Sequence, residues 1–211
     1  MSKSGQSAAD IIMQIDEADL ARVFWEYGEE KASRRIAKAI CCVREETEIT
    51  STSQLAAIIR SVMPAKRPGQ IDPATRSFQA LRIFVNRELD ELTAGLEAVE
   101  RLLRPGGILA VVSFHSLEDR IVKRFLASRG QYASRPSRHR PVIDGPAPSF
   151  KILTRKAILP IEDERNQNSR ARSAKLRIAR RTDAPPLGMA AAPFSTINQT
   201  IRSQRESKQC G

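Results

Sequence analysis

Aromatic residues, cysteines and long apolar runs are all scarce in this sequence. Aromatic side chains make up 5% of the 211 residues, which is too few for an extensive platform on which nucleic-acid bases could stack. No apolar stretch reaches the roughly 18 residues that a membrane-spanning helix needs. The first residues, MSKSGQSAADII, also lack the apolar core of a secretory signal. We therefore expect a cytoplasmic protein that does not bind membranes.

The cysteines predict neither a disulfide framework nor a metal site. Cys41 and Cys42 are adjacent, and the third, Cys210, is remote. Adjacent cysteines rarely pair, and no cluster of His and Cys has the spacing of a zinc site. Cys41 and Cys42 are expected to be reduced residues in or beside a helix core.

Positive charge is the most prominent feature that is present. The chain contains 35 Lys and Arg residues and 24 Asp and Glu residues, which gives a net charge of +11. This excess of positive charge indicates a polyanionic partner. The alternative is a basic tail on an ordinary domain. The basic residues are spread along the whole chain, which favours the partner, and a hydrophobic content of 41% supports a packed core.

Helical periodicity dominates the first hundred residues. Ser7 is placed to cap a first helix, and Asp16 precedes a second one that ends at Gly28. A third helix has apolar residues on one face and cations on the other. These cations are Lys31, Arg34, Arg35 and Lys38. A fourth follows the polar residues 50–53 and ends before Pro64, and residues 66–70 are expected to form a loop.

A single long helix is predicted over residues 72–103. Asp72 and Pro73 open it, since proline suits the first turn of a helix. Apolar residues then recur at helical spacing. They are Phe78, Leu81, Val85, Leu89, Leu92, Leu96, Val99 and Leu103.

The second half of the chain alternates strands and a helix. The apolar run Ile108–Ser113 predicts a strand buried on both faces of a parallel sheet. Ser116 is expected to cap the following helix, with Asp119 in the third position. Residues 150–155 and 174–179 alternate and predict two further strands.

Two segments predict little regular structure. Residues 128–149 are rich in Arg, Ser and Pro and indicate a flexible loop. The sequence after Thr182 lacks periodicity and indicates a disordered, basic end.

Polar residues on the long helix form a candidate binding stripe. Thr75, Gln79, Arg82 and Asn86 share one face. The mixture of hydroxyl, amide and guanidinium groups suits hydrogen bonding to a polar ligand. A solvated helix face is the alternative.

A second candidate site lies where the apolar strand meets the next helix. Ser113, His115 and Ser116 follow the strand end, which is where ligands bind in open α/β sheets. The alternative is that Ser116 only caps the helix and His115 only packs. Nearby, Asp119 could belong to an ordinary surface ion pair, and further along, Arg170 and Arg172 could hold phosphates.

Five segments together resemble one enzyme family. They are GQSAAD at 5–10, ADLARVFWEYGEEKASRRIAKAI at 18–40, DPATRSFQALRIFVNRELDEL at 72–92, LRPGGILAVVSFHSLEDRIVKRF at 103–125 and NSRARSAKLRIARRT at 168–182. In this order they are similar to the bacterial small-subunit rRNA methyltransferases that modify cytosine N4, known as RsmH or MraW.

The resemblance implies a fold, a reaction and a substrate. The implied fold class is α/β, the carboxy-terminal half of a Rossmann-type methyltransferase sheet preceded by a helical insertion subdomain. We expect residues 1–70 to form that subdomain, 71–182 to form the long helix and the remaining methyltransferase elements, and 183–211 to form the tail. The implied reaction is transfer of a methyl group from S-adenosylmethionine to a cytidine of small-subunit (16S) rRNA in the ribosome.

The resemblance also distributes roles among residues. The target base would be lined by Arg82, Asn86, Ser113, His115 and Ser116. The RNA phosphates would be contacted by Arg34, Arg35, Arg76, Lys123, Arg170 and Arg172. No residue can be assigned as the catalytic base, no metal is implied, and the oligomeric state is open, a homodimer included.

One part of the family pattern is missing. The family begins with strands that carry a glycine-rich loop and an acidic residue, which hold S-adenosylmethionine. Here the only Gly-Gly pair, Gly106–Gly107, precedes a late strand. We therefore expect no cofactor-binding residues in this chain and no methyl transfer by the chain alone. The alternative is a non-catalytic RNA- or ribosome-binding protein derived from such an enzyme.

Overall fold

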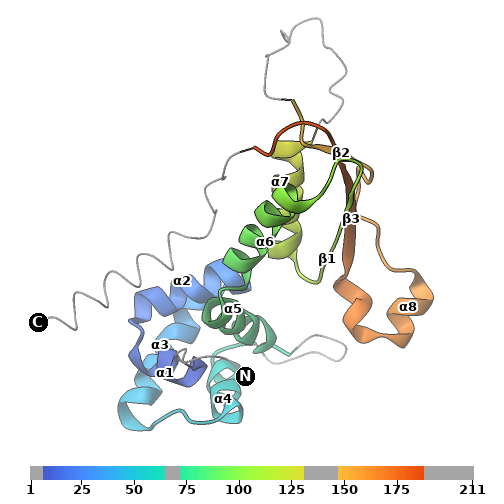
Figure 1. Cartoon of the computed structure of the whole chain (residues 1–211). Helices are drawn as coiled ribbons and strands as arrows, with labels where there is room; N and C mark the ends of the chain where they lie inside the picture. Colours follow the sequence, from blue (N-terminus) through green and yellow to red (C-terminus); the bar gives the residue numbers. More distant parts are fainter. Residues whose placement is uncertain (1–6, 65–71, 131–146, 188–211) are drawn as a thin grey trace, which may run out of the picture. The chain divides into compact units, whose positions relative to one another are not determined.

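A computed structural model describes residues 7–64, 72–130 and 147–187 (Figure 1). These residues divide at Glu88 into two compact units. We call residues 7–88 the helical unit and residues 89–187 the sheet unit. The predicted loop at 66–70 and most of the predicted loop at 128–149 lie outside the described residues, as do residues 188–211.

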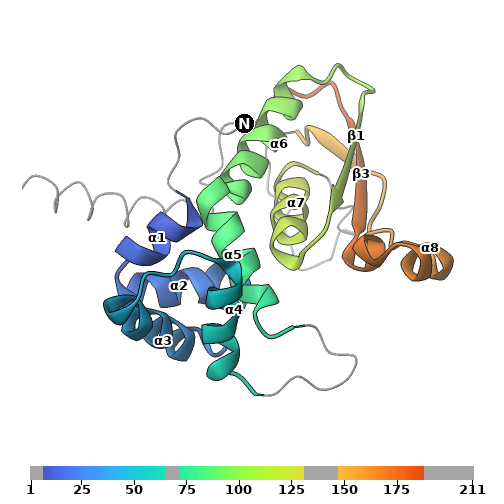
Figure 2. The ribbon, with the colours of Figure 1, turned by 90° about the horizontal axis from the view of Figure 1, so that it is seen from below.

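The helical unit contains five helices. They are α1 (Ala8–Gln14), α2 (Glu17–Gly28), α3 (Ser33–Glu46), α4 (Thr52–Ser61) and α5 (Thr75–Asn86). Helix α2 packs against both α3 and α5 (Figure 2). The predicted apolar faces of α2 and α3 form the core, in which Leu20, Phe24, Ile36 and Ile40 are fully buried.

The helix starts follow the predicted caps closely. The Ser7 hydroxyl accepts the N–H of Asp10 at 3.2 Å, and the Ser7 N–H donates to the Asp10 carboxylate at 2.8 Å, so the predicted Ser7 cap is confirmed. Asp16 occupies the N-cap position of α2 without a side-chain capping bond. Helix α4 begins inside the polar segment 50–53, because Ser51 and Gln54 form a second capping box there.

Gly28 ends α2, as predicted, but its role is to permit close packing. The left-handed residue at this helix end is Glu29, with φ of 49°. A Cβ atom on Gly28 would lie 2.8 Å from the carbonyl oxygen of Arg76 in α5. Glycine therefore allows α2 and α5 to approach each other here.

The predicted long helix at 72–103 is wrong as a single element. Helix α5 ends at Asn86 and α6 (Glu88–Leu102) begins two residues later. Arg87, between them, adopts a left-handed conformation with φ of 54°. The apolar stripe continues through both helices, and no glycine or proline signals the break.

The sheet unit contains a three-stranded antiparallel sheet. Its strands are β1 (Ile108–Ser113), β2 (Phe150–Ile152) and β3 (Lys175–Arg181), in the order β1-β3-β2. Helix α7 (Ser116–Arg129) contacts all three strands. A short helix, α8 (Glu162–Gln167), and the 3-10 turn Ser169–Ser173 precede β3.

The predictions for these elements are partly wrong. Strand β1 pairs antiparallel with β3, and among the described residues it has no parallel neighbour. Only one of its faces is buried, since Ile108 and Val112 are 48% and 52% exposed. The predicted loop at 128–149 starts too early, because α7 continues to Arg129. A mixed α/β fold is confirmed, and the described residues form a three-stranded antiparallel sheet.

The core of the sheet unit lies between α7 and the strands. Leu117, Ile121 and Val122 are buried on α7. The rings of Phe125 in α7 and Phe150 in β2 lie 5.9 Å apart. The apolar face of α7 therefore covers one face of the sheet.

Candidate functional site

The predicted binding stripe on α5 ends in a hydrogen-bonded cluster. The guanidinium of Arg82 donates to both carboxylate oxygens of Glu88, at 2.9 and 3.0 Å. The Asn86 amide donates to the same carboxylate at 3.1 Å. Gln79 lies one turn earlier, with its amide 3.5 Å from the carbonyl of Tyr27. Three members of the stripe therefore have polar partners.

An apolar groove adjoins this cluster within the helical unit. Its volume is about 330 Å³, and it lies among α1, residues 49–55 and α5. Arg82 and Asn86 are among the residues that line it. The stripe thus borders a concave surface, as expected for residues that line a pocket. Glu88 was not predicted, although its position two residues after Asn86 could have indicated it.

The junction between β1 and α7 is held by a capping box. His115 is the N-cap residue, and its Nδ1 accepts the N–H of Glu118 at 3.3 Å. The Glu118 carboxylate accepts the N–H groups of Phe114 at 2.6 Å and of His115 at 3.2 Å. The prediction that Ser116 caps this helix with Asp119 is wrong by one residue. Ser116 is the first helical residue instead.

The two other predicted residues of this junction have structural contacts. Ser113 is buried and donates to the carbonyl of Lys175 in β3 at 3.3 Å. His115 Nε2 is buried and lies 3.3 Å from Glu118, but it forms no hydrogen bond. Phe114, which was not predicted, is 55% exposed at the strand end.

The surroundings of Glu118 favour the charged form of its carboxylate. Burial alone would raise its pKa. The nearby imidazole of His115 and the backbone N–H groups of Phe114 and His115 outweigh burial and bring the pKa below its usual value. The turn at the end of β1 therefore carries a fixed negative charge beside the imidazole.

A buried cluster of charges joins α7 to β3. Asp119 accepts from Arg177 Nε at 2.7 Å and from Lys175 Nζ at 3.3 Å. Burial raises the pKa of Asp119, but the bonds and charges of Arg177 and Lys175 more than offset it and lower the pKa. Asp119 therefore belongs to a largely buried charge cluster, and the alternative of an ordinary surface ion pair is wrong. The spacing of Lys175 and Arg177, two residues apart on a strand, could have indicated their common face.

The predicted phosphate-contacting residues are all exposed. Arg34 and Arg35 lie at the start of α3, Arg76 in the first turn of α5 and Lys123 on α7. Arg170 and Arg172 lie in the 3-10 turn before β3. Exposure allows RNA contact but does not test it.

The predicted target-base residues divide between the two units. Arg82 and Asn86 belong to the helical unit, and Ser113, His115 and Ser116 belong to the sheet unit. Within each unit the predicted residues are neighbours. A pocket that both groups share stays a prediction.

Among the described residues, two features bear on metal and cofactor binding, namely the metal-ligating side chains and the glycine-rich turn. They contain no cluster of three His, Cys, Asp or Glu side chains suited to a metal ion. None of the described helices is long and apolar enough to cross a membrane. Gly106 adopts φ of 83° in the turn that enters β1, opposite to the strand end at which ligands bind, and its N–H donates to Arg181. The Gly106–Gly107 turn therefore does not fit the role of the family's donor-binding loop.

The structure is a mixed α/β protein with a capped turn between β1 and α7 and exposed basic residues in both units. Residues 1–182 match the model of the MraW methylase family, and the chain belongs to this family.

Curated relatives support the same assignment. Two proteins called "Ribosomal RNA small subunit methyltransferase H" are similar to this chain. The one from Azorhizobium caulinodans is 57% identical over 185 residues, which are 88% of this chain and 53% of that protein. The one from Ruegeria sp. is 52% identical over 195 residues, 92% of this chain and 59% of that protein. The chain thus spans little more than half the length of the relatives that it matches.

Proposed function

We propose that this chain forms the target-base side of an rRNA methyltransferase. The whole enzyme would transfer a methyl group from S-adenosylmethionine to N4 of a cytidine in small-subunit rRNA. The observation that carries this proposal is the match of residues 1–182 to the MraW methylase family, together with curated relatives named as small-subunit rRNA methyltransferases.

The chemistry of the acceptor explains what the chain would contribute. The lone pair of the cytosine amine is delocalised into the ring, so this nitrogen is a weak nucleophile. Transfer then depends on fixing the base in one orientation and on an acceptor for the amine proton. The rigid turn at Ser113–Ser116, held by Glu118, offers a fixed edge for the base. Arg82 and Asn86 offer hydrogen-bond donors, and the exposed arginines offer contacts to phosphates.

The position of the Gly-Gly pair and the edge of the sheet support a donor site outside the described residues. The Gly106–Gly107 turn lies at the wrong end of β1, and β1 has a strand partner on one edge only among the described residues. One face of β1, which carries the exposed apolar residues Ile108 and Val112, is left uncovered by the described residues. We propose that the 211-residue polypeptide alone transfers no methyl group.

A chimera with a relative tests the function directly. The segment of the Azorhizobium caulinodans protein that aligns with this chain would be replaced by residues 1–182. Tritium from labelled S-adenosylmethionine would be followed into small subunits that lack the modification. We expect transfer by the chimera and none by the 211-residue polypeptide. Turnover by the polypeptide alone would refute its proposed inactivity.

The alternative is a non-catalytic protein that binds rRNA or the ribosome. A folded chimera that binds small subunits but transfers no methyl group would favour it. Salt-dependent affinity for small subunits is expected of both functions, so affinity alone does not separate them.

A further inference from the structure

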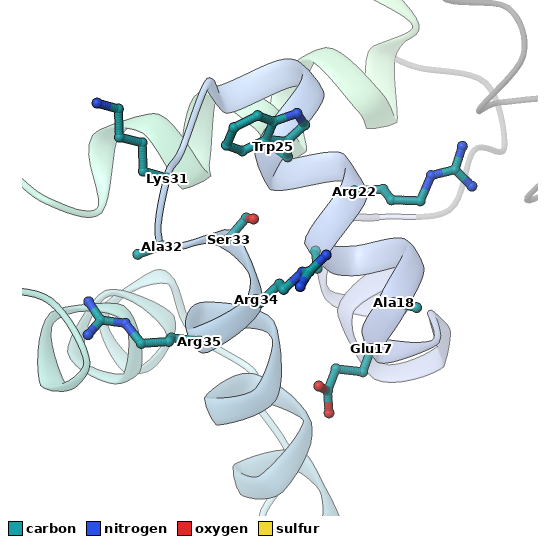
Figure 3. Close-up of a pocket in the computed structure, with 10 residues that line it drawn as sticks. Glu17, Ala18, Arg22, Trp25, Lys31, Ala32, Ser33, Arg34 and Arg35 are labelled. Atoms are coloured by element: carbon teal, nitrogen blue, oxygen red, sulfur yellow. The ribbon is translucent and has the colours of Figure 1, made fainter.

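A broad groove lies between α2 and the start of α3, within the helical unit (Figure 3). Its volume is about 1130 Å³. Typical pockets for small molecules measure roughly 300–1,000 Å³. The groove is also open along one side, as Figure 3 shows. Its size and openness suit part of a polymer better than an enclosed small ligand.

The only tryptophan of the chain stands in this groove. Trp25 is 58% exposed, whereas its neighbour Phe24 is completely buried in the core. Figure 3 shows the indole ring on α2 above the turn that contains Lys31 and Ser33. A large exposed aromatic face beside a cavity is available for stacking with a planar ligand.

Cations surround the indole ring. Arg22, Lys31, Arg34 and Arg35 line the groove, against a single carboxylate, Glu17. Arg22 lies 3.6 Å from Asp19 and also interacts electrostatically with Glu26. For the other three, no ion pair forms with any carboxylate in the described part of the chain. In Figure 3, Arg34 extends across the groove toward α2.

We propose that this groove binds an unpaired stretch of RNA, with one base stacked on Trp25 and its phosphates held by Lys31 and Arg34. The unbalanced positive charge favours a polyanion over a protein surface. The exposed indole distinguishes a single strand from a duplex, since paired bases hide their faces in the helix stack. The inference rests on the proposed function in one respect, namely that the polyanion is RNA.

The single tryptophan makes the groove directly observable. The 211-residue chain would be titrated with a single-stranded RNA of about ten nucleotides and with a duplex of the same sequence. Stacking on the indole quenches its fluorescence. We expect saturable quenching by the single strand and little by the duplex. Equal quenching by both, or none by either, would overturn the proposal.

Variants of Trp25 separate stacking from simple exposure. Affinity would be measured from the anisotropy of a labelled single strand, because these variants lose the fluorescent indole. Trp25→Leu is expected to weaken binding about tenfold, and Trp25→Phe by less because a ring remains. Both variants should keep the helical circular dichroism of the unchanged chain, since Trp25 is exposed. A Trp25→Leu variant that binds the single strand normally contradicts the proposal.

A matched pair of cations on α3 tests the phosphate contacts. Arg34 lines the groove, and Lys38 is exposed on the same helix outside it. Arg34→Ala should reduce the slope of log K against log salt by about 0.7, the value for one phosphate of a single strand. Lys38→Ala should leave the slope unchanged. Equal effects of the two substitutions would show that only the overall charge matters, against the proposal.

The outcome is independent of methyl transfer. If the chimera is inactive but single strands still quench Trp25, the proposed function fails and the groove assignment stands. If the chimera is active and Trp25→Leu has no effect on RNA binding, the groove assignment alone fails. Loss of small-subunit binding by Trp25→Leu without loss of oligonucleotide binding would indicate a protein partner and overturn the proposal.

Discussion

Different kinds of interaction stabilise the helical unit and the sheet unit. In the helical unit the buried side chains between α2, α3 and α5 are mostly apolar, and its described ion pairs, such as Arg60–Asp72 and Arg82–Glu88, are partly exposed. In the sheet unit, Arg129 and Glu100 form an ion pair whose side chains are only 3% and 1% exposed. Exposed pairs contribute little to stability, whereas breaking a buried pair is costly. The two units should therefore respond differently to the same kind of change.

Removing a core aromatic should have the largest effect, and it should act on the helical unit. Phe24→Ala empties a fully buried position in α2 and is expected to lower the free energy of unfolding by about 3–5 kcal/mol. The loss of stability would be measured by urea denaturation, with hydrogen exchange used to monitor unfolding of each unit separately. The adjacent Trp25→Ala is the matched control and should change stability by less than about 0.5 kcal/mol. Similar losses from both substitutions would mean that α2 does not pack as described.

Breaking the buried ion pair should weaken the sheet unit. Arg129→Met leaves Glu100 buried with Ser149 and the Leu187 N–H but without its cation. The expected loss is about 3 kcal/mol, measured as faster hydrogen exchange in α6 and α7. Arg124→Met on the exposed side of α7 is the control. Replacing Glu100 by Met as well should restore part of the stability, and no restoration would contradict this account.

A methyl group added at two glycines should have opposite effects in the two units. Gly28→Ala places a Cβ 2.8 Å from a backbone oxygen of α5, so the helical unit should lose about 1–3 kcal/mol. Gly95 lies in α6 with no atom within 4 Å of such a Cβ. Gly95→Ala should therefore stabilise the sheet unit by about 0.5–1 kcal/mol. Thermal unfolding of both variants tests the pair, and stabilisation by Gly28→Ala would exclude the close approach of α2 and α5.

Acid is the mildest perturbation and should affect the sheet unit first. Burial raises the pKa of Glu100, but hydrogen bonds from Ser149 and Arg129 outweigh burial, so the pKa is lowered. The pKa of Asp119 is also raised by burial and lowered overall, mainly by Arg177. Such carboxylates stabilise the fold above their ordinary pKa values of 4.5 and 3.8. That contribution is lost as the pH falls through the lowered values. In the helical unit, burial instead raises the pKa of Glu26.

Hydrogen exchange at stepped pH would compare the units. We expect protection in α7 and β3 to decline at a higher pH than protection in α2 and α3. The double variant with Met at Glu100 and Arg129 should reduce this difference. Earlier loss in α2 and α3 would contradict the assignment of the buried carboxylates as the acid-sensitive groups.

Local patterns predicted much of the fold. Apolar spacing located α2 and α3 because a helix places every third or fourth residue on one face. Ser7 and Gly28 located two helix ends. The break at Arg87 could not be predicted, since neither glycine nor proline marks it and the apolar stripe continues. His115 was missed as a cap because serine is a much commoner cap than histidine.

The candidate site was predicted in part. Arg82 and Asn86 were correctly placed on one face, and Ser113–Ser116 at a strand end. Glu88 and Glu118, which hold these groups, were missed. The exposure of Trp25 was not predicted, because helical periodicity does not show which face of a helix is left uncovered by the rest of the fold.

The sequence by itself determined the family, the excess of positive charge and the course of most helices, since these depend on residue identity and short-range spacing. Tertiary structure decided which charges are buried and which are available. Glu100 meets Arg129 across 29 residues, and Asp119 meets Arg177 across 58. Such partners are selected by the folded backbone. The same folding leaves Arg34 and Trp25 beside an open groove and withdraws Arg129 and Arg177 from solvent.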